Sequence, residues 1–328
     1  MRKALLIGID DYPFGYDLHG CVNDVNSLEP LLKRNGDGSK LFDVKTLRNL
    51  QSSSKAMEEI TELFSGDEDV ALLYFSGHGC DNGNGVEIVF PDDIKSETTH
   101  STGIQLDEIL TVANKSKVRN KVFILDSCYS GAMGEGSPSR KDSSLYPGVT
   151  ILSACRNDQT AMELGNHGAF TTRLCQALEG EAATVDGTIT LGGIYAYVDS
   201  MFGSWEQRPV FKTNVSQFVA FRKVKPRVDI NIIRLITTYF EEPDVEYKLD
   251  PSYEFTNTED HKDRYKLIEP LGIPEHIEIL KNLQKLESIG LIEPVGEEHM
   301  YFAVMRSKSC RLTLLGKHFW NLIHNDRI

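Results

Sequence analysis

Short apolar runs alternate with longer amphipathic stretches through the first two-thirds of the chain. Short runs rich in branched and aromatic side chains predict strands, and stretches whose apolar residues recur at helical spacing predict helices. The predicted strands are Lys3–Ile9, Val44–Leu47, Val70–Phe75, Lys121–Asp126, Val149–Ser153 and Phe218–Arg222. The predicted helices are Gly20–Arg34, Lys55–Phe64, Gln105–Asn114, Ala169–Leu178 and Leu191–Met201. This alternation predicts an α/β fold, an open, mostly parallel sheet flanked by helices on both sides.

Two of the predicted strands, Val70–Phe75 and Lys121–Asp126, are almost wholly apolar, as expected for strands buried on both faces of a parallel sheet. In such sheets the ligand site lies beyond the carboxyl ends of the strands. Polar residues follow both strands, at Ser76-Gly77-His78-Gly79 and at Ser127-Cys128. The sequence therefore predicts a site at this edge.

Two segments between these elements read as loops. The glycines in Asp81–Gly85 predict the turn of a small hairpin that runs to Pro91. Residues 130–148 are polar and rich in Gly, Ser and Pro, and a loop of this length inside a compact domain is usually functional or disordered.

The alternating pattern stops near Pro226, which predicts a linker between domains at 1–224 and 225–328. The second part predicts helices at Asp229–Glu241 and Pro274–Ser288, the segment Gly290-Leu291-Ile292-Glu293, a turn, a strand at Met300–Met305 and a last helix at Leu312–His324. This order resembles a winged helix-turn-helix.

Composition narrows the class of protein. The 328 residues are 40% hydrophobic and 25% charged, as in soluble globular proteins, and the net charge of −13 disfavours a general nucleic-acid binder while admitting a cationic substrate. Residues 225–328 carry 14 Lys and Arg against 18 Asp and Glu, a net charge of −4, so a regulatory or protein-interaction role is preferred over DNA binding.

Neither a membrane nor a secretory pathway is expected. No apolar run approaches the roughly 20 residues of a membrane span, and the apolar N-terminus is interpreted as a buried first strand, not a signal peptide. Six cysteines without CxxC pairs are typical of reduced thiols in the cytoplasm; they stand at positions 21, 80, 128, 155, 175 and 310.

Cys128 and His78 are the candidate nucleophile and its proton-transfer partner. A thiol protease needs a thiolate, a base and donors for the developing oxyanion, and the amide of Gly79 is a candidate donor. An imidazolium beside Cys128 would lower the pKa of the thiol. Considered alone, Cys128 is more simply interpreted as a buried apolar side chain and His78 as a turn residue. Their pairing after two buried strands favours function.

The motifs "LLYFSGHG" and "VFILDSCYSG" resemble the caspase–metacaspase peptidases, in which the histidine precedes the cysteine by about 50 residues. The caspase signature Q-A-C-x-G is absent, and Asp126-Ser127-Cys128 stands in the metacaspase-like form. "ALLIGIDDY", "LHGCVNDV", "ILSACRNDQTAME" and "GAFT" extend the resemblance over about residues 1–222. It implies a caspase-like fold and a cysteine endopeptidase.

Specificity is expected to be for Arg or Lys before the cut. Residues i and i+2 of a strand face the same side, so Asp126 is expected to face the region of Cys128 and to pair with a basic side chain. The resemblance adds Asp24, Ser76 and Cys21 to this pocket. The alternatives are a helix N-terminal carboxylate for Asp24, a turn serine for Ser76 and helix packing for Cys21.

The resemblance also suggests processing and a metal. Arg140 and Lys141 form a dibasic site that the enzyme could cut in itself, the alternative being a solvated loop. No cofactor is required by the chemistry, but metacaspase-like enzymes are often calcium-dependent. The acidic residues near the family's ligand positions, which solvated surface carboxylates explain equally well, are Asp92, Asp93, Asp107, Glu108 and Glu135.

Other functions stay open. A CHAT-type or separase-like protease would recognise a longer peptide, and a winged-helix regulator would use the caspase-like part as a scaffold. An inactive pseudo-enzyme is disfavoured by the intact His and Cys motifs. Compact caspase-like proteins with appended domains look like stress-response or antiviral-defence effectors.

Overall fold

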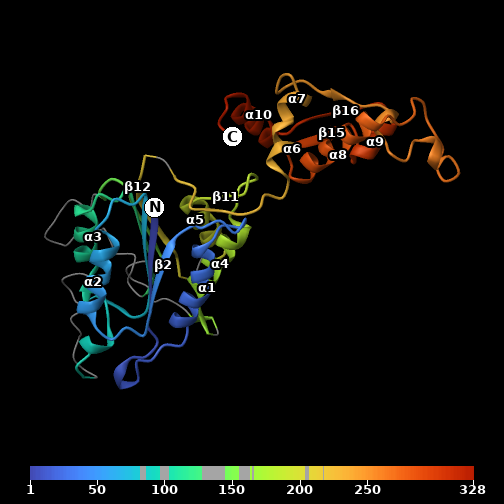
Figure 1. The fold of residues 1–328 in the computed structure, drawn as a ribbon. Coiled ribbons are helices and arrows are strands. Elements are labelled where there is room, and N and C mark those ends of the chain that lie inside the picture. Colours follow the sequence, from blue (N-terminus) through green and yellow to red (C-terminus); the bar gives the residue numbers. More distant parts are fainter. Residues whose placement is uncertain are drawn as a thin grey trace. The chain divides into compact units, whose positions relative to one another are not determined.

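The computed structural model describes residues 1–81, 86–96, 103–127, 145–154, 163–164, 166–203, 207–216 and 218–328. These residues divide into two compact units, Met1–Lys225 and Pro226–Ile328 (Figure 1). Within the described ranges no helix is both long and apolar enough to cross a membrane.

A six-stranded sheet forms the centre of the first unit, in the order β12-β8-β7-β3-β1-β2. The strands from β2 to β8 run parallel, and β12 pairs antiparallel with β8 at one edge. The mostly parallel sheet is therefore confirmed. The strands are β1 (Arg2–Gly8), β2 (Asp43–Arg48), β3 (Val70–Ser76), β7 (Asn120–Asp126), β8 (Val149–Ser153) and β12 (Val210–Asn214).

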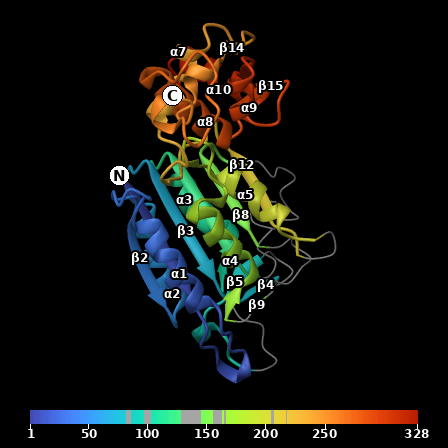
Figure 2. The ribbon, with the colours of Figure 1, turned by 90° about the vertical axis from the view of Figure 1, so that its right-hand side faces the viewer.

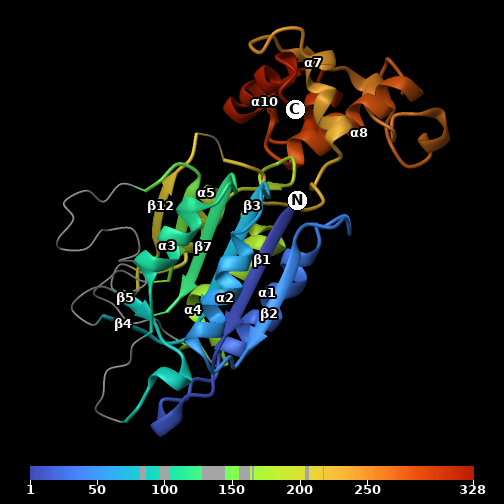
Figure 3. The same ribbon diagram turned by 60° about the vertical axis from the view of Figure 1, so that its left-hand side comes forward.

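Helices cover both faces of this sheet, as predicted. One face carries α1 (Cys21–Lys33), α4 (Ala169–Gln176) and α5 (Leu191–Ser200), seen in Figure 2. The other face carries α2 (Ser53–Leu63) and α3 (Leu106–Lys115), seen in Figure 3.

The side chains of β3 show how the sheet positions the site. All seven residues of β3 are buried, and alternate side chains enter different cores. Leu72 and Tyr74 pack with residues of α1, whereas Leu73 and Phe75 pack with residues of α2 and α3. Ser76 continues the first series, so it lies on the α1 side of the sheet.

The predicted strand Phe218–Arg222 is wrong, and β12 is the sixth strand. Phe221 is fully buried against Phe42, and only Arg222 with Lys223 forms a short strand, β13, which pairs with β11 (Thr188–Ile189). Of the apolar run at 218–221 only Phe221 is buried, and none of these residues pairs in the main sheet. β12 was missed because an edge strand with half-buried side chains has no continuous apolar run.

Short elements lie around the carboxyl edge of the sheet. The predicted hairpin pairs β4 (Gly79–Asp81) antiparallel with β5 (Val86–Ile88), while residues 82–85 lie outside the described residues. The remaining short elements at this edge are η1 (Pro13–Gly15), η2 (Pro91–Asp93), β6 (Ile104–Gln105), β9 (Glu163–Leu164) and β10 (His167–Gly168). The π-helical segment η4 (Ala177–Glu181) follows α4.

The second unit combines helices with the three-stranded sheet β14-β16-β15. Its helices are α6 (Ile230–Arg234), α7 (Ile236–Tyr239), α8 (Pro274–Ser288), α9 (Met300–Met305) and α10 (Leu314–His324). Its other elements are β14 (Tyr247–Lys248), η5 (Pro251–Tyr253), η6 (Glu259–His261), β15 (Ile292–Val295) and β16 (Ser309–Leu312).

The predicted strand at Met300–Met305 is wrong, because this segment is the helix α9. Its buried residues are Met300, Ala303 and Val304, and this spacing of three and four is helical, not alternating. The predicted helix Asp229–Glu241 is divided into α6 and α7. The order of elements on which the winged-helix resemblance rested is therefore not the observed one, and the winged-helix assignment stays a prediction.

Candidate active site

The site lies where two neighbouring strands end. β3 and β7 are parallel neighbours, with Ser76 opposite Asp126. The chain continues from Ser76 to His78, and from Asp126 to the buried Ser127. Cys128 is next in the sequence and lies outside the described residues. The described part of the site is therefore an imidazole and the side chains around two strand ends.

The ring of His78 is half-buried, and its hydrogen bond fixes its tautomer. Nε2 lies 2.7 Å from the carbonyl oxygen of Tyr16. Because a carbonyl can only accept, Nε2 carries the hydrogen, and in the neutral ring Nδ1 keeps its lone pair. Nδ1 is therefore the nitrogen that can accept a proton.

Tyr12 holds the backbone of this histidine. Its hydroxyl accepts from the N–H of His78 at 3.0 Å and donates to the carbonyl of Val89 at 3.1 Å, and the two rings meet edge to face at 4.5 Å. Burial raises the pKa of Tyr12 far above its usual range, so the phenol stays protonated. A Cβ on Gly77 would lie 2.7 Å from this hydroxyl, which explains the glycine before His78.

The N–H of Gly79 points away from the hairpin. The N–H of Val89 donates to the carbonyl of His78 at 3.0 Å, so these two residues face each other as a hydrogen-bonded pair. In an antiparallel ladder bonded and non-bonded pairs alternate, and Gly79 opposite Ile88 is the non-bonded pair. The N–H of Gly79 therefore makes no hydrogen bond within the ladder of β4 and β5 and can donate to another acceptor.

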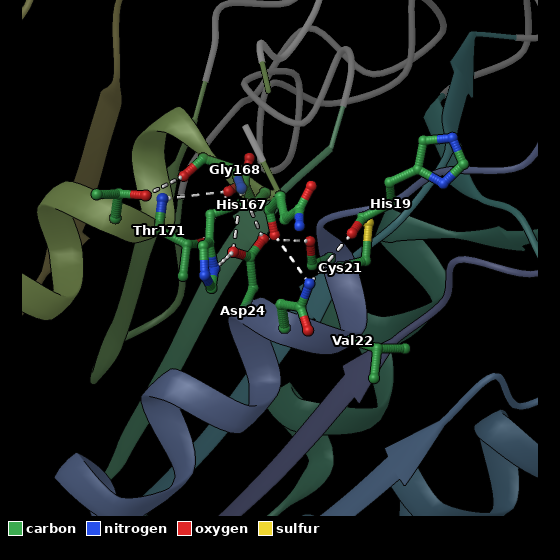
Figure 4. Close-up of polar contacts among 12 residues, drawn as sticks. His19, Cys21, Val22, Asp24, His167, Gly168 and Thr171 are labelled. Atoms are coloured by element: carbon green, nitrogen blue, oxygen red, sulfur yellow. Dashed lines mark hydrogen bonds and ion pairs between the residues drawn. The ribbon is translucent and has the colours of Figure 1, made fainter. Parts of the chain in front are cut away.

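Asp24 is fully buried on α1 and is hydrogen-bonded to residues of two other elements, β3 and β10 (Figure 4). Its carboxylate accepts from the Ser76 hydroxyl at 3.1 Å and from the N–H of Gly168 at 3.0 and 3.2 Å. The Nδ1 atom of His167 lies 3.2 Å from Oδ1. The helix N-terminus is instead capped by Asp10, whose carboxylate accepts from the N–H of Cys21 at 2.8 Å. Asp24 is thus not a simple capping residue.

Asp126 is the second buried carboxylate, and it is held from α4. Its Oδ2 atom accepts from the hydroxyl of Thr171 at 2.7 Å and from the N–H of the same residue at 3.2 Å. The hydroxyl of Tyr74 lies 2.7 Å from the Thr171 hydroxyl, so Tyr74 donates to Thr171 and Thr171 donates to Asp126. Donors of this kind favour the ionised carboxylate.

Gly168 lies between the two carboxylates. A Cβ on it would come within 2.2 Å of Oδ2 of Asp126 and 2.9 Å of Oδ2 of Asp24. Its φ of −63° is open to any residue, so space and not backbone conformation requires the glycine here. The two carboxylates therefore both lie close to Gly168, one from α1 and the other from β7.

Cys21 completes this group. Its thiol is buried and hydrogen-bonded with Ser76. Burial raises its pKa well above the usual range, and the charges of Asp10, Asp126 and Asp24 add to the effect. A thiol in this setting stays protonated and is a poor nucleophile. The structure thus brings together all four predicted pocket residues, Asp24, Asp126, Ser76 and Cys21.

The caspase-domain family (peptidase family C14) has a sequence model that matches residues 1–219 of this chain. The chain belongs to that family.

Curated relatives of this caspase-domain chain are metacaspases. Metacaspase-1A of Neurospora crassa is 31% identical over 148 residues, which cover 40% of this chain and 32% of that protein. Metacaspase-6 of Arabidopsis thaliana is 28% identical over 229 residues, covering 62% and 58%. Metacaspase-3 of Trypanosoma cruzi is 28% identical over 215 residues, covering 56% and 59%. The chain thus spans from about a third to three fifths of these relatives.

A crystal structure of caspase-1 from Spodoptera frugiperda matches with a TM-score of 0.49 and 17% identity over 68% of this chain and 90% of that one. The predicted resemblance to the caspase–metacaspase family is confirmed by the family model.

The predicted acidic metal ligands are not assembled in the described part of this caspase-domain chain. Asp93 accepts from the hydroxyl of Ser53 at 2.7 Å and from the N–H of Phe90 at 3.3 Å, and burial raises its pKa. Asp107 and Glu108 are exposed in the first turn of α3, and Asp92 is exposed in η2. Among the described residues no group of three His, Cys, Asp or Glu could hold a metal ion.

Besides Cys128, three predicted site residues are not among those described, and four residues of the observed site were not predicted. Glu135, Arg140 and Lys141 lie outside the described residues. Sequence reasoning gave no role to Tyr12, His167, Gly168 or Thr171. The available signal was the "GAFT" motif, which begins at Gly168, but its contact with two carboxylates depends on the fold.

Proposed function

We propose that this caspase-domain chain is a cysteine endopeptidase of metacaspase type, with Cys128 as nucleophile and His78 as its proton-transfer partner, that cleaves after Arg or Lys. The observation that carries the specificity is the pair of buried carboxylates at the strand edge where the candidate dyad leaves β3 and β7. Support for the chemistry comes from the family membership and from the metacaspases among the relatives.

Proton transfer in this proposal runs through Nδ1 of His78. Nδ1 takes the thiol proton of Cys128, and the sulfur bonds to the carbonyl carbon of the scissile peptide. The carbon–nitrogen bond then breaks as Nδ1–H protonates the leaving amine. A water molecule gives one proton to Nδ1 and its oxygen to the thioester, and the carbon–sulfur bond breaks as the sulfur recovers the proton. The bond from Nε2 to Tyr16 holds the ring in the tautomer that this cycle needs.

The oxyanion is stabilised in this proposal by the N–H of Gly79, which the hairpin ladder leaves unused. A preorganised backbone donor of this kind contributes about 3 to 4 kcal/mol in acyl transfer. The carbonyl oxygen of the substrate would then lie on the side of β4 that faces away from β5.

A basic side chain fits the acid pair on electrostatic grounds. Asp24 and Asp126 accept hydrogen bonds from neutral donors, Ser76, Gly168 and Thr171, which orient the oxygens without cancelling their charge. A guanidinium can bind carboxylate oxygens through two parallel hydrogen bonds, and an ammonium can bind as a point charge. Both Arg and Lys are therefore expected before the cut.

Peptide reporters that differ only in the residue before the cut test this function. Wild type is expected to cleave Arg and Lys reporters, and Asp126→Asn is expected to lose at least about a hundredfold in kcat/KM on the Arg reporter, because a charged partner of the substrate is removed. Asp67→Asn, an exposed carboxylate change on the opposite edge of the sheet, is the matched control. Equal or faster turnover of an Asp reporter by wild type would contradict the specificity.

Three further expectations belong to this proposal. Self-processing at Arg140 or Lys141 would follow from the same specificity. Calcium dependence stays a prediction without a described set of ligands, and the reporter assay in the presence of a chelator tests it. A reducing compartment such as the cytoplasm agrees with the free thiols of Cys21, Cys80, Cys175 and Cys310.

A further inference from the structure

His167 contacts the acid pair from the exposed side. It lies in β10, directly before Gly168, and its side chain is 41% exposed while that of Asp24 is 1% exposed. Nδ1 of the ring lies 3.2 Å from Oδ1 of Asp24 (Figure 4). A half-exposed imidazole thus touches a carboxylate that is itself closed to solvent.

Protonation of this ring changes its charge without changing its hydrogen bond. A carboxylate only accepts, so Nδ1 donates to Asp24 in both states of the ring, and the second proton enters or leaves at Nε2. With both carboxylates ionised and His167 neutral, the acid pair carries two negative charges. With His167 protonated, the imidazolium and Asp24 form an ion pair, and one net negative charge remains for a cationic ligand.

Two thiols and one phenol near Asp24 stay neutral over the range in which imidazoles titrate, while Asp10, at the N-terminus of α1, is a further carboxylate. Burial raises the pKa of Cys175, on α4, to about 12, and burial also raises the pKa of Cys21, on α1, well above its usual range. Burial likewise raises the pKa of Tyr74, on β3, well above its usual range. Asp126, from β7, supplies the second charge of the pair. Imidazole is the ordinary side chain that changes charge near neutral pH, and His167 is the described imidazole that contacts the carboxylate of Asp24.

We propose that His167 is a specificity-determining residue that makes binding of a basic substrate side chain depend on pH. The proposal rests on the proposed function. A substrate cation and a protonated His167 compete for the same carboxylate charge, so the cation binds best when the ring is neutral. Affinity therefore rises with pH through the titration of His167 and falls on acidification. By reciprocity, a bound basic peptide makes His167 harder to protonate.

Binding of an uncleaved Arg peptide to Cys128→Ala tests this without turnover. From pH 8 to pH 5.5 the dissociation constant is expected to rise about tenfold, as an extra positive charge a few ångströms from the site predicts. In Cys128→Ala/His167→Gln the amide keeps a donor for Asp24 but cannot be charged, and the rise is expected to fall below about twofold. Protonation of His78 is common to both variants, so the difference isolates His167.

A second measurement tests the role of His167 even if the double variant does not fold. The His167 ring signal in Cys128→Ala, followed by nuclear magnetic resonance, is expected to titrate at lower pH with the Arg peptide bound than without it. An unchanged titration, or equal pH dependence of binding in both variants, overturns the role of His167. Failure of wild type to cleave any Arg or Lys reporter between pH 5.5 and pH 8 overturns the proposed function instead.

Discussion

The absence of a side chain at Gly168 leaves room for two buried carboxylates. The oxygens of Asp24 and Asp126 occupy the space that a Cβ at this position would need. The backbone there has ordinary dihedral angles, so the only obstacle to a larger residue is steric overlap with the two carboxylates. A change at Gly168 should therefore act on substrate recognition more than on folding.

Gly168→Ala is expected to lower kcat/KM for the Arg reporter by about a hundredfold, because displacement of a binding group by about 1 Å costs on that order. The measurement is steady-state kinetics, with circular dichroism as a check on folding. Gly192→Ala, on α5, is the matched control, since its Cβ would meet Phe218 at 3.4 Å or more. Unchanged kinetics in Gly168→Ala would mean that the acid pair does not hold the substrate.

At the scale of elements, the loop after β1 is tied to the hairpin of β4 and β5 through one hydroxyl. Tyr12 takes the place of a direct bond between the N–H of His78 and the carbonyl of Val89. Removal of the hydroxyl leaves both backbone groups without this partner in a mostly buried setting. The position of His78, the candidate catalytic histidine, is therefore linked to the stability of this junction.

Tyr12→Phe is expected to lower the free energy of unfolding by about 1 to 3 kcal/mol, the usual cost of unsatisfied buried polar groups. Urea denaturation measures this, and kcat is expected to fall while the preference for Arg is kept. Tyr197→Phe, which removes a hydrogen bond of 3.5 Å to Gln176, is the control. Wild-type stability and kcat in Tyr12→Phe would show that the bridge does not position His78.

The elements that could be predicted are those whose burial is visible in the sequence. β3 and β7 are continuous apolar runs because both of their faces are covered. The predicted ends of these two strands allowed Ser76, His78 and Asp126 to be identified as site residues. β12 was missed because an edge strand with half-buried side chains has no continuous apolar run. α9 was predicted as a strand because a short apolar run of six residues does not by itself distinguish a strand from a helix.

Residues that meet only in the fold were missed. Gly168 reaches Asp24 across 144 positions, and Thr171 reaches Asp126 across 45. The sequence around one partner gives no indication of the other, because the contact forms only when the helices pack on the same face of the sheet. Motif resemblance identified Asp24, and its contact with His167 required coordinates.

At the scale of the whole molecule, every described residue of the candidate site lies in the first unit, Met1–Lys225, within which the family model matches. The unit 226–328 carries its own apolar core, with buried Leu283, Leu286 and Trp320. A regulatory or interaction role for that unit stays a proposal, and the peptidase proposal does not depend on it.

Mass-spectrometric mapping of cut sites in a complex protein mixture, with wild type compared with Cys128→Ala, tests the central claim most directly. Wild type is expected to produce new termini after Arg or Lys and a cut in this chain's own 130–148 segment, and Cys128→Ala is expected to produce none of these. Cuts after acidic residues, or the same cuts with both proteins, would contradict it.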